Sequence, residues 1–235
     1  MPARAGGEGP RPKIRGVCFD LFTLFDPRSV VTVAREVAGD RAAELCEAWR
    51  GRQFQYAFLR AAGERYVDFR RCTEDALDYA AKAQGLSLVA GDRDRLVGAY
   101  SELEPWPDAK VTLEALRAEG LALAPLANYA PAMLERLLAN AGLTDHFDAV
   151  ISTDAARTFK PSPRAYALGP ERLGLPPASV AFAAFGGWDA AGAKWFGLPT
   201  FWVNRLGVQA EHLDPPPDGT GATVSELPAF IRAWA

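Results

Sequence analysis

Four polar residues stand at or just beyond the ends of short apolar runs, and they are the residues whose spacing predicts chemistry. Asp20 directly follows the run over residues 16–19, and Asn128, Lys160 and Asp189 come after later runs. Reactive groups in open α/β sheets lie at the carboxyl ends of buried parallel strands, and the run before Asp20 is typical of such a strand. We therefore interpret Asp20 as a candidate nucleophile; the alternative is a residue that caps the turn after the strand.

The elements that must position these residues alternate between strand and helix. Apolar runs predict strands, and segments with helical periodicity and glycine stops predict helices between them. This alternation predicts an α/β fold, a Rossmann-like doubly wound parallel sheet. Connections at such a sheet bring strand ends together, so the four polar residues are expected to form one site. The predicted strands cover residues 16–19, 121–126, 149–152, 180–184 and 200–203.

A helical segment interrupts this alternation after the first strand. Residues 41–62 form a long amphipathic stretch, a helix start is predicted at Thr73, and residues 92–102 predict a further helix. Pro105-Trp106-Pro107-Asp108 marks the return to the alternating part. We predict an inserted all-helical cap at 28–104 and a core made of 13–27 and 105–235.

The composition and net charge of the chain argue against several classes of function. The chain has 235 residues, is 49% apolar and carries a net charge of -3, which does not indicate a binder of nucleic acid or of a membrane surface. No apolar run approaches the roughly 20 residues of a membrane span, and residues 1–12 are interpreted as a disordered leader. Three cysteines without metal-like spacing and two isolated histidines predict neither a disulfide framework nor a metal site, and a reducing cytoplasm is expected.

Several motifs, taken with their order and spacing, resemble the haloacid dehalogenase superfamily, and within it the L-2-haloacid dehalogenases. That family carries D-x-Y-G-T-L-F-D at its first strand, W-R-x-x-Q/K, Y-x-x-F and T-E-D-A-L in its cap, and S-N, K-P and W-D-A-x-G-A beyond it. The corresponding residues here are 20–26, Trp49–Gln53, Tyr66–Phe69, Thr73–Leu77, Ala127-Asn128, Lys160-Pro161 with Tyr166, and Trp188–Ala193, followed by Phe196–Thr200 and Trp202–Arg205.

The resemblance implies hydrolysis of a small 2-substituted carboxylic acid through an aspartyl ester. Asp20 would attack the α-carbon and displace the substituent, and water would then release a 2-hydroxy acid. Lys160 would orient Asp20, and Asp189 would take a proton from the water. No cofactor is implied, and by analogy with family members we expect a homodimer formed through the cap. Substrate-binding roles are implied for Leu21, Phe22, Thr23, Arg50, Phe54, Phe69, Asn128, Tyr166 and Trp188, with Arg50 and Asn128 receiving the leaving halide.

The chain also departs from the family pattern. The glycine expected between Phe22 and Thr23 is missing, so the loop after Asp20 must have a different shape. Ala127, Ala184 and Gly186 replace residues that carry hydrogen-bonding side chains, and Pro125 falls inside a predicted central strand.

These departures keep alternatives open. One is hydrolysis of L-azetidine-2-carboxylate, in which the same attack opens a strained ring. Another is a protein that binds through its cap without catalysis. A phosphatase is disfavoured, because that branch of the superfamily needs a second acid two residues after the nucleophile, where this chain has Phe22.

Overall fold

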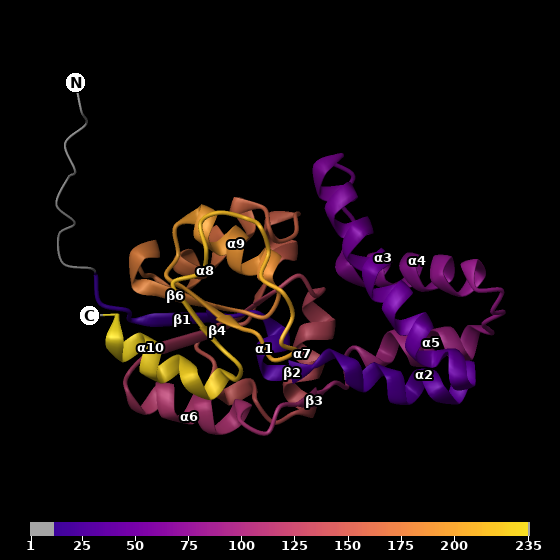
Figure 1. Ribbon diagram of the computed structural model, residues 1–235, viewed down its shortest axis with the longest axis horizontal. Helices are drawn as coiled ribbons and strands as arrows, with labels where there is room; N and C mark the ends of the chain where they lie inside the picture. Colours follow the sequence, from indigo (N-terminus) through magenta and orange to yellow (C-terminus); the bar gives the residue numbers. More distant parts are fainter. Residues whose placement is uncertain (1–11, 235) are drawn as a thin grey trace.

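A six-stranded parallel sheet forms the larger body of the computed structural model, which describes residues 12–234 (Figure 1). The predicted leader lies outside these residues, apart from Pro12. The strand order is β5-β4-β1-β6-β7-β8, and this confirms the predicted parallel α/β sheet. The strands are β1 (Gly16–Phe19), β4 (Ala122–Ala127), β5 (Ile151–Ser152), β6 (Val180–Ala184), β7 (Thr200–Val203) and β8 (Gly219–Gly221).

Helices cover both faces of the sheet because alternate strand residues point to opposite sides. Val17 and Phe19 of β1 join the apolar cluster beneath α6, α7 and α10, whereas Cys18 joins the cluster beneath α8 and α9. Figure 1 shows α6 and α10 on one side of the strands and α8 and α9 on the other. These helices are α6 (Ala109–Ala118), α7 (Pro131–Asn140), α8 (Pro163–Leu173), α9 (Gly187–Phe196) and α10 (Leu227–Ala233).

Pro125 lies in the central strand β4 without breaking the sheet. On the side of β4 away from β1, the N–H of Leu123 donates to the Asp148 carboxylate, and the Leu123 carbonyl accepts from Asp148 N. Pro125, two residues on, faces that same side, where β5 pairs only from Leu126 onward. Its missing N–H therefore falls where no strand partner is required.

The cap is a separate helical body that stands beside the sheet in Figure 1. The chain leaves the core after the short helix α1 (Leu21–Leu24) and crosses through β2 (Phe25–Asp26), which pairs with the returning β3 (Glu104–Pro105). Between them lie α2 (Val30–Ala38), α3 (Ala42–Ala62), α4 (Phe69–Ala83) and α5 (Ala90–Ala99).

The predicted start of α4 at Thr73 is wrong by one turn. Asp68 caps the helix, because its carboxylate accepts from Arg71 N at 2.8 Å. Thr73 instead lies inside the helix, where its hydroxyl donates to Phe69 O and accepts from Gln53 of α3. The predicted last cap helix, 92–102, also lies earlier in the structure, at 90–99.

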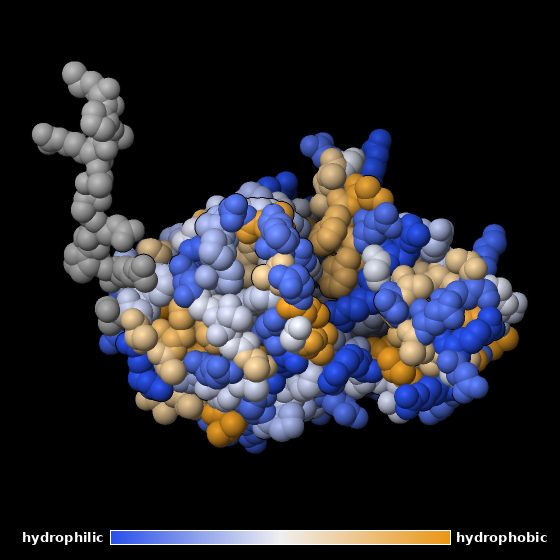
Figure 2. Space-filling view, viewed as in Figure 1, coloured by the Kyte–Doolittle hydropathy of each residue, from blue (hydrophilic) through white to orange (hydrophobic). Residues whose placement is uncertain are grey.

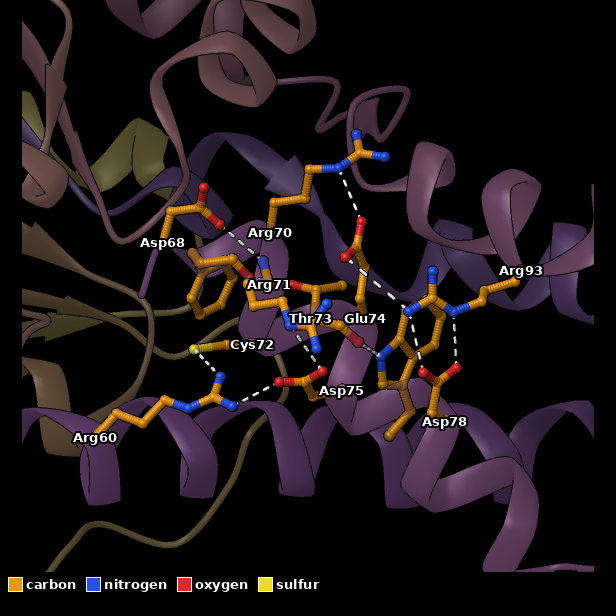
Figure 3. A network of polar contacts seen from close by, with 12 residues as sticks. Arg60, Asp68, Arg70, Arg71, Cys72, Thr73, Glu74, Asp75, Asp78 and Arg93 are labelled. Carbon is orange, nitrogen blue, oxygen red and sulfur yellow. Dashed lines mark hydrogen bonds and ion pairs between the residues drawn. The ribbon is translucent and has the colours of Figure 1, made fainter. Parts of the chain in front are cut away.

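Charged side chains join the cap helices to one another. Figure 3 shows Arg60 of α3 and Arg71 of α4 on the two oxygens of Asp75, and Arg93 of α5 on Asp78. Trp49 Nε1 adds a buried hydrogen bond to Thr73 O. These contacts hold α3 and α4 in a fixed arrangement, and with them the residues that face the sheet body.

The molecular surface mixes polar and apolar residues. Figure 2 shows hydrophilic side chains over both bodies and an apolar strip at the boundary between them, along the projecting end of α3. Within residues 12–234, none of the helices has the length and apolar character needed to span a membrane.

Candidate active site

Three residues predicted from strand ends meet in one charged cluster. Lys160 Nζ lies 2.7 Å from Asp20 Oδ1 and 2.6 Å from Asp189 Oδ2. The side chains of Lys160 and Asp189 are both 1% exposed, whereas that of Asp20 is 13% exposed. Asp20 is therefore the carboxylate that can contact a substrate. Asp189 lies on the far side of the Lys160 ammonium from Asp20.

Burial and charge set the protonation of this cluster. Burial raises the pKa of Asp189 to about 6, against the opposing effect of the Lys160 ammonium. Burial lowers the pKa of Lys160, but the carboxylates of Asp189 and Asp20 outweigh it and raise the pKa overall. Burial, together with the charge of Asp189, also raises the pKa of Tyr166, so its phenol donates to Asp189 Oδ1 at 2.6 Å. The lysine is thus a fixed cation, and the pKa of Asp189 is about 6.

The turn after Asp20 lacks the glycine of the family pattern and forms the single-turn helix α1. Asp20 is its N-cap and accepts from Phe22 N at 3.3 Å, while the hydroxyl of Thr23 donates to Asp20 O at 2.7 Å. Thr23 therefore points back at the backbone and does not line the cavity, which differs from its predicted substrate-binding role. The shortened loop explains this, because it closes directly into a helical turn.

Two distant side chains hold the carbonyl oxygens of this turn, which a four-residue helix leaves without internal partners. Trp106 Nε1 donates to Phe22 O at 3.0 Å, and Arg205 Nη2 donates to Thr23 O at 2.9 Å. Arg205 also pairs with Asp108 at 2.7 Å and lies over the Trp106 ring. Trp106 and Arg205 lie in sequence motifs that predict no role for them, and no local signal predicts these contacts.

Asn128 fixes the backbone of the lysine. Its Oδ1 accepts from Lys160 N at 2.8 Å and from Thr153 Oγ1 at 3.2 Å. Its Nδ2 has only a long contact of 3.5 Å with Lys160 O, so this donor remains available for a ligand.

A cavity of about 230 Å³ opens in front of Asp20, between the sheet body and the cap. Most of the predicted binding residues line it, but Tyr166 does not: it is buried behind Lys160 and holds Asp189. Sequence reasoning missed the contribution of the segment after β7. The lining residues include Asp20, Leu21, Phe22, Arg50, Phe54, Phe69, Ala127, Asn128, Tyr129, Lys160, Phe185, Gly186, Trp188 and Arg205, with Asn204, Leu206, Val208 and Glu211 from the segment after β7.

Arg50 is the cation that the cap contributes. Its guanidinium carbon lies 4.7 Å from the centre of the Phe22 ring and 5.6 Å from that of Phe54. Among the described residues it forms no ion pair, whereas Lys160 and Arg205 both contact carboxylates. Arg50 thus offers a positive charge to an anion in the cavity.

Gly186 makes room for the indole of Trp188. A Cβ at Gly186 would lie 2.7 Å from Trp188 Nε1, so the side chain that the family pattern expects here would displace this ring. Trp188 in turn packs on Phe54 at 5.5 Å and on Phe58 at 5.3 Å, both from the cap. The glycine at 186 therefore leaves room for Trp188 to contact the cap.

Comparisons with known proteins point to one family. A family model described as haloacid dehalogenase-like hydrolase matches residues 14–197. The (S)-2-haloacid dehalogenase of Pseudomonas sp. (strain YL) is 40% identical over 206 residues, 87% of this chain and 89% of the relative.

Solved structures agree with this match. The L-2-haloacid dehalogenase RSc1362 has a TM-score of 0.91 at 39% identity, covering 94% of this chain and 100% of the other. The Xanthobacter autotrophicus L-2-haloacid dehalogenase with chloropropionic acid covalently bound has a TM-score of 0.89 at 37% identity, with the same coverage.

Proposed function

Because this chain belongs to the haloacid dehalogenase-like hydrolases, we propose that it is an L-2-haloacid dehalogenase that hydrolyses small 2-haloacids to 2-hydroxy acids. The observation that carries the proposal is Lys160 Nζ between the cavity-facing Asp20 and the buried Asp189. A relative with a covalently bound chloropropionic acid supports an ester intermediate.

In the first step Asp20 attacks the α-carbon and the halide leaves. Lys160 orients the carboxylate through its 2.7 Å contact with Oδ1, and the aromatic walls keep water from solvating it. Arg50 receives the departing halide beside the ring of Phe22. Leu21 and the amide nitrogen of Asn128, whose contact with Lys160 O is long, border the space in which the substrate carboxylate is placed.

In the second step water attacks the ester carbonyl of Asp20. Asp189 takes the proton, because a carboxylate whose pKa is about 6 is ionised at neutral pH and still basic enough to accept it. Gly186, in the cavity wall beside the first turn of α9, is where the water approaches. Lys160 stabilises the oxyanion that forms on the former Asp20 carboxylate.

Chloride release from L-2-chloropropionate tests the proposal. The wild-type protein should release one chloride for each 2-hydroxy acid formed, and Asp20→Asn should release none. Asp26→Asn is the matched control, since Asp26 lies six residues on and pairs with the exposed Arg28. Chloride release that persists in Asp20→Asn contradicts the proposed nucleophile.

Ring opening of L-azetidine-2-carboxylate is the second candidate. The small side chains at Ala127 and Gly186 favour a compact ring in the cavity. The positive charge of Arg50 disfavours it, because the departing amine takes up a proton and the two cations repel. Formation of 4-amino-2-hydroxybutyrate without chloride release in parallel assays would reverse this order.

A further inference from the structure

Tyr66 reaches from the cap to the sheet body. It belongs to the connection between α3 and α4, and its hydroxyl donates to Asp154 Oδ1 at 2.5 Å. The centres of the Tyr66 and Phe159 rings lie 5.1 Å apart. The guanidinium carbon of Arg157 lies over the Tyr66 ring, also 5.1 Å from its centre. Three residues of the segment between β5 and Lys160 thus contact one cap side chain.

This segment is linked to Lys160 by two routes. Phe159 directly precedes Lys160 in the chain. Asp154 lies in the 3₁₀ turn Thr153–Ala156, and Thr153 Oγ1 donates to the same Asn128 oxygen that accepts from Lys160 N. These two routes connect the turn that contains Asp154 to the backbone of the lysine.

The contact is also linked to the cavity wall on the cap side. Tyr66 lies three residues before Phe69, whose ring packs on Phe159 at 5.9 Å and lines the cavity. Burial, together with the hydrogen bond to Asp154, raises the pKa of Tyr66, so the phenol remains a hydrogen-bond donor across the working pH range.

We propose that Tyr66 is a positioning residue that couples the cap to Lys160. Its bond to Asp154 and its packing on Phe159 seat the cap over the cavity and hold the loop that places the ammonium between Asp20 and Asp189. The inference rests on the proposed function, because it concerns the part of Lys160 in that chemistry.

Tyr66→Phe tests the coupling by removing only the hydroxyl. For L-2-chloropropionate we expect kcat to fall about tenfold, as for a misplaced catalytic group, while KM changes little. The acid limb of the kcat–pH profile should move to higher pH, because the ammonium of Lys160 lowers the pKa of Asp189. Tyr79→Phe is the control: Tyr79 is a cap tyrosine of α4 whose ring contacts Tyr56 and Arg52.

Asp154→Ala should reproduce these changes, and the double variant should lose no more than either single variant, as expected for one interacting pair. Losses that add up, or a Tyr66→Phe enzyme whose kcat and pH profile equal those of Tyr79→Phe, overturn the proposal.

Amide hydrogen exchange separates this proposal from the proposed function. Exchange over residues 153–160 should be faster in Tyr66→Phe than in Tyr79→Phe. Equal exchange in the two variants overturns the coupling, whatever the activity. A wild-type protein that releases no halide overturns the proposed function. The exchange comparison does not depend on activity, so it still tests whether Tyr66 holds the segment that precedes Lys160.

Discussion

The two sides of the cavity are built from different kinds of interaction. On the sheet side, Asp20, Lys160 and Asp189 are joined by buried ion pairs of 2.7 and 2.6 Å. On the cap side, the guanidinium of Arg50 lies over aromatic rings, and Phe54 packs edge-on against Trp188. Hydrogen-bonded ion pairs fix atoms in direction as well as distance, whereas aromatic packing tolerates small shifts. We infer that the sheet side carries the chemistry and the cap side recognises the leaving group.

Lys160→Met should show the largest effect, because it removes the cation shared by two carboxylates. We expect a loss of about 10³-fold in kcat, comparable to removal of a transition-state donor. The unpaired buried Asp189 should also lower the free energy of unfolding by about 3–5 kcal/mol. Lys194→Met, which breaks the ion pair to Asp218 away from the cavity, serves as the control in both steady-state kinetics and denaturant unfolding. Equal kinetic losses in the two variants would contradict the part of Lys160 in the chemistry of the sheet side.

Arg50→Lys should be the largest effect on the cap side, since an ammonium cannot spread over the Phe22 ring as a guanidinium does. We expect a loss of about 2 kcal/mol in transition-state stabilisation, or about 30-fold in kcat/KM. The loss should differ between chloro, bromo and iodo substrates, because Arg50 meets the leaving group. Arg52→Lys, on the same helix but over Tyr79, should stay near wild type. A loss that is the same for every halide would assign Arg50 to the substrate carboxylate instead.

The pH dependence of kcat should follow Asp189. Its pKa is about 6, so below that pH the residue gains a proton and no longer accepts one from water, and kcat falls. The hydrogen bond from Tyr166 stabilises the carboxylate and lowers this pKa; Tyr166→Phe should therefore move the midpoint to higher pH. A pH–rate profile of both proteins measures the shift. A midpoint that is unchanged or lower in Tyr166→Phe contradicts the assignment of this limb to Asp189.

Gly186→Ala should give the smallest effect, at the contact between the two sides. The added methyl group collides with Trp188 Nε1, and overpacking of this kind costs about 1–3 kcal/mol. We expect a lower Tm and a moderately higher KM. Gly51→Ala in α3 is the matched control: its Cβ would meet no atom within 4 Å, and the substitution should raise Tm, since alanine is the better helix former. A Gly186→Ala protein as stable as wild type would show that the indole moves freely.

The sequence predicted which groups meet on the sheet side, because a general topological rule applies there. Asp20 and Asp189 are carried by segments that leave parallel strands, and such segments share one edge of the sheet. The edge strand β8 was missed, because Gly219–Gly221 lies in a Pro- and Gly-rich tail without an apolar run. The predicted start of α4 is wrong because Thr73, like Asp68, belongs to the residue types that are preferred at N-caps, and the fold decides between them.

Contacts between distant segments could not be predicted from local patterns. Trp106 and Arg205 reach the turn after Asp20 from 84 and 182 residues away in the chain. The motifs predict that Thr23 and Tyr166 bind substrate, but neither residue lines the cavity, because a motif does not say which way a side chain points. Both stand behind the reacting groups, where they hold Asp20 and Asp189.

A single turnover in water enriched in heavy oxygen tests the central claim most directly. With enzyme in excess over L-2-chloropropionate, hydrolysis of an Asp20 ester places one heavy oxygen in the peptide that contains Asp20, and the released 2-hydroxy acid carries an ordinary oxygen from the enzyme. Mass spectrometry of the digested protein and of the product gives both values. Heavy oxygen in the product hydroxyl, with none in the Asp20 peptide, would mean that water attacks the substrate directly and would contradict the account.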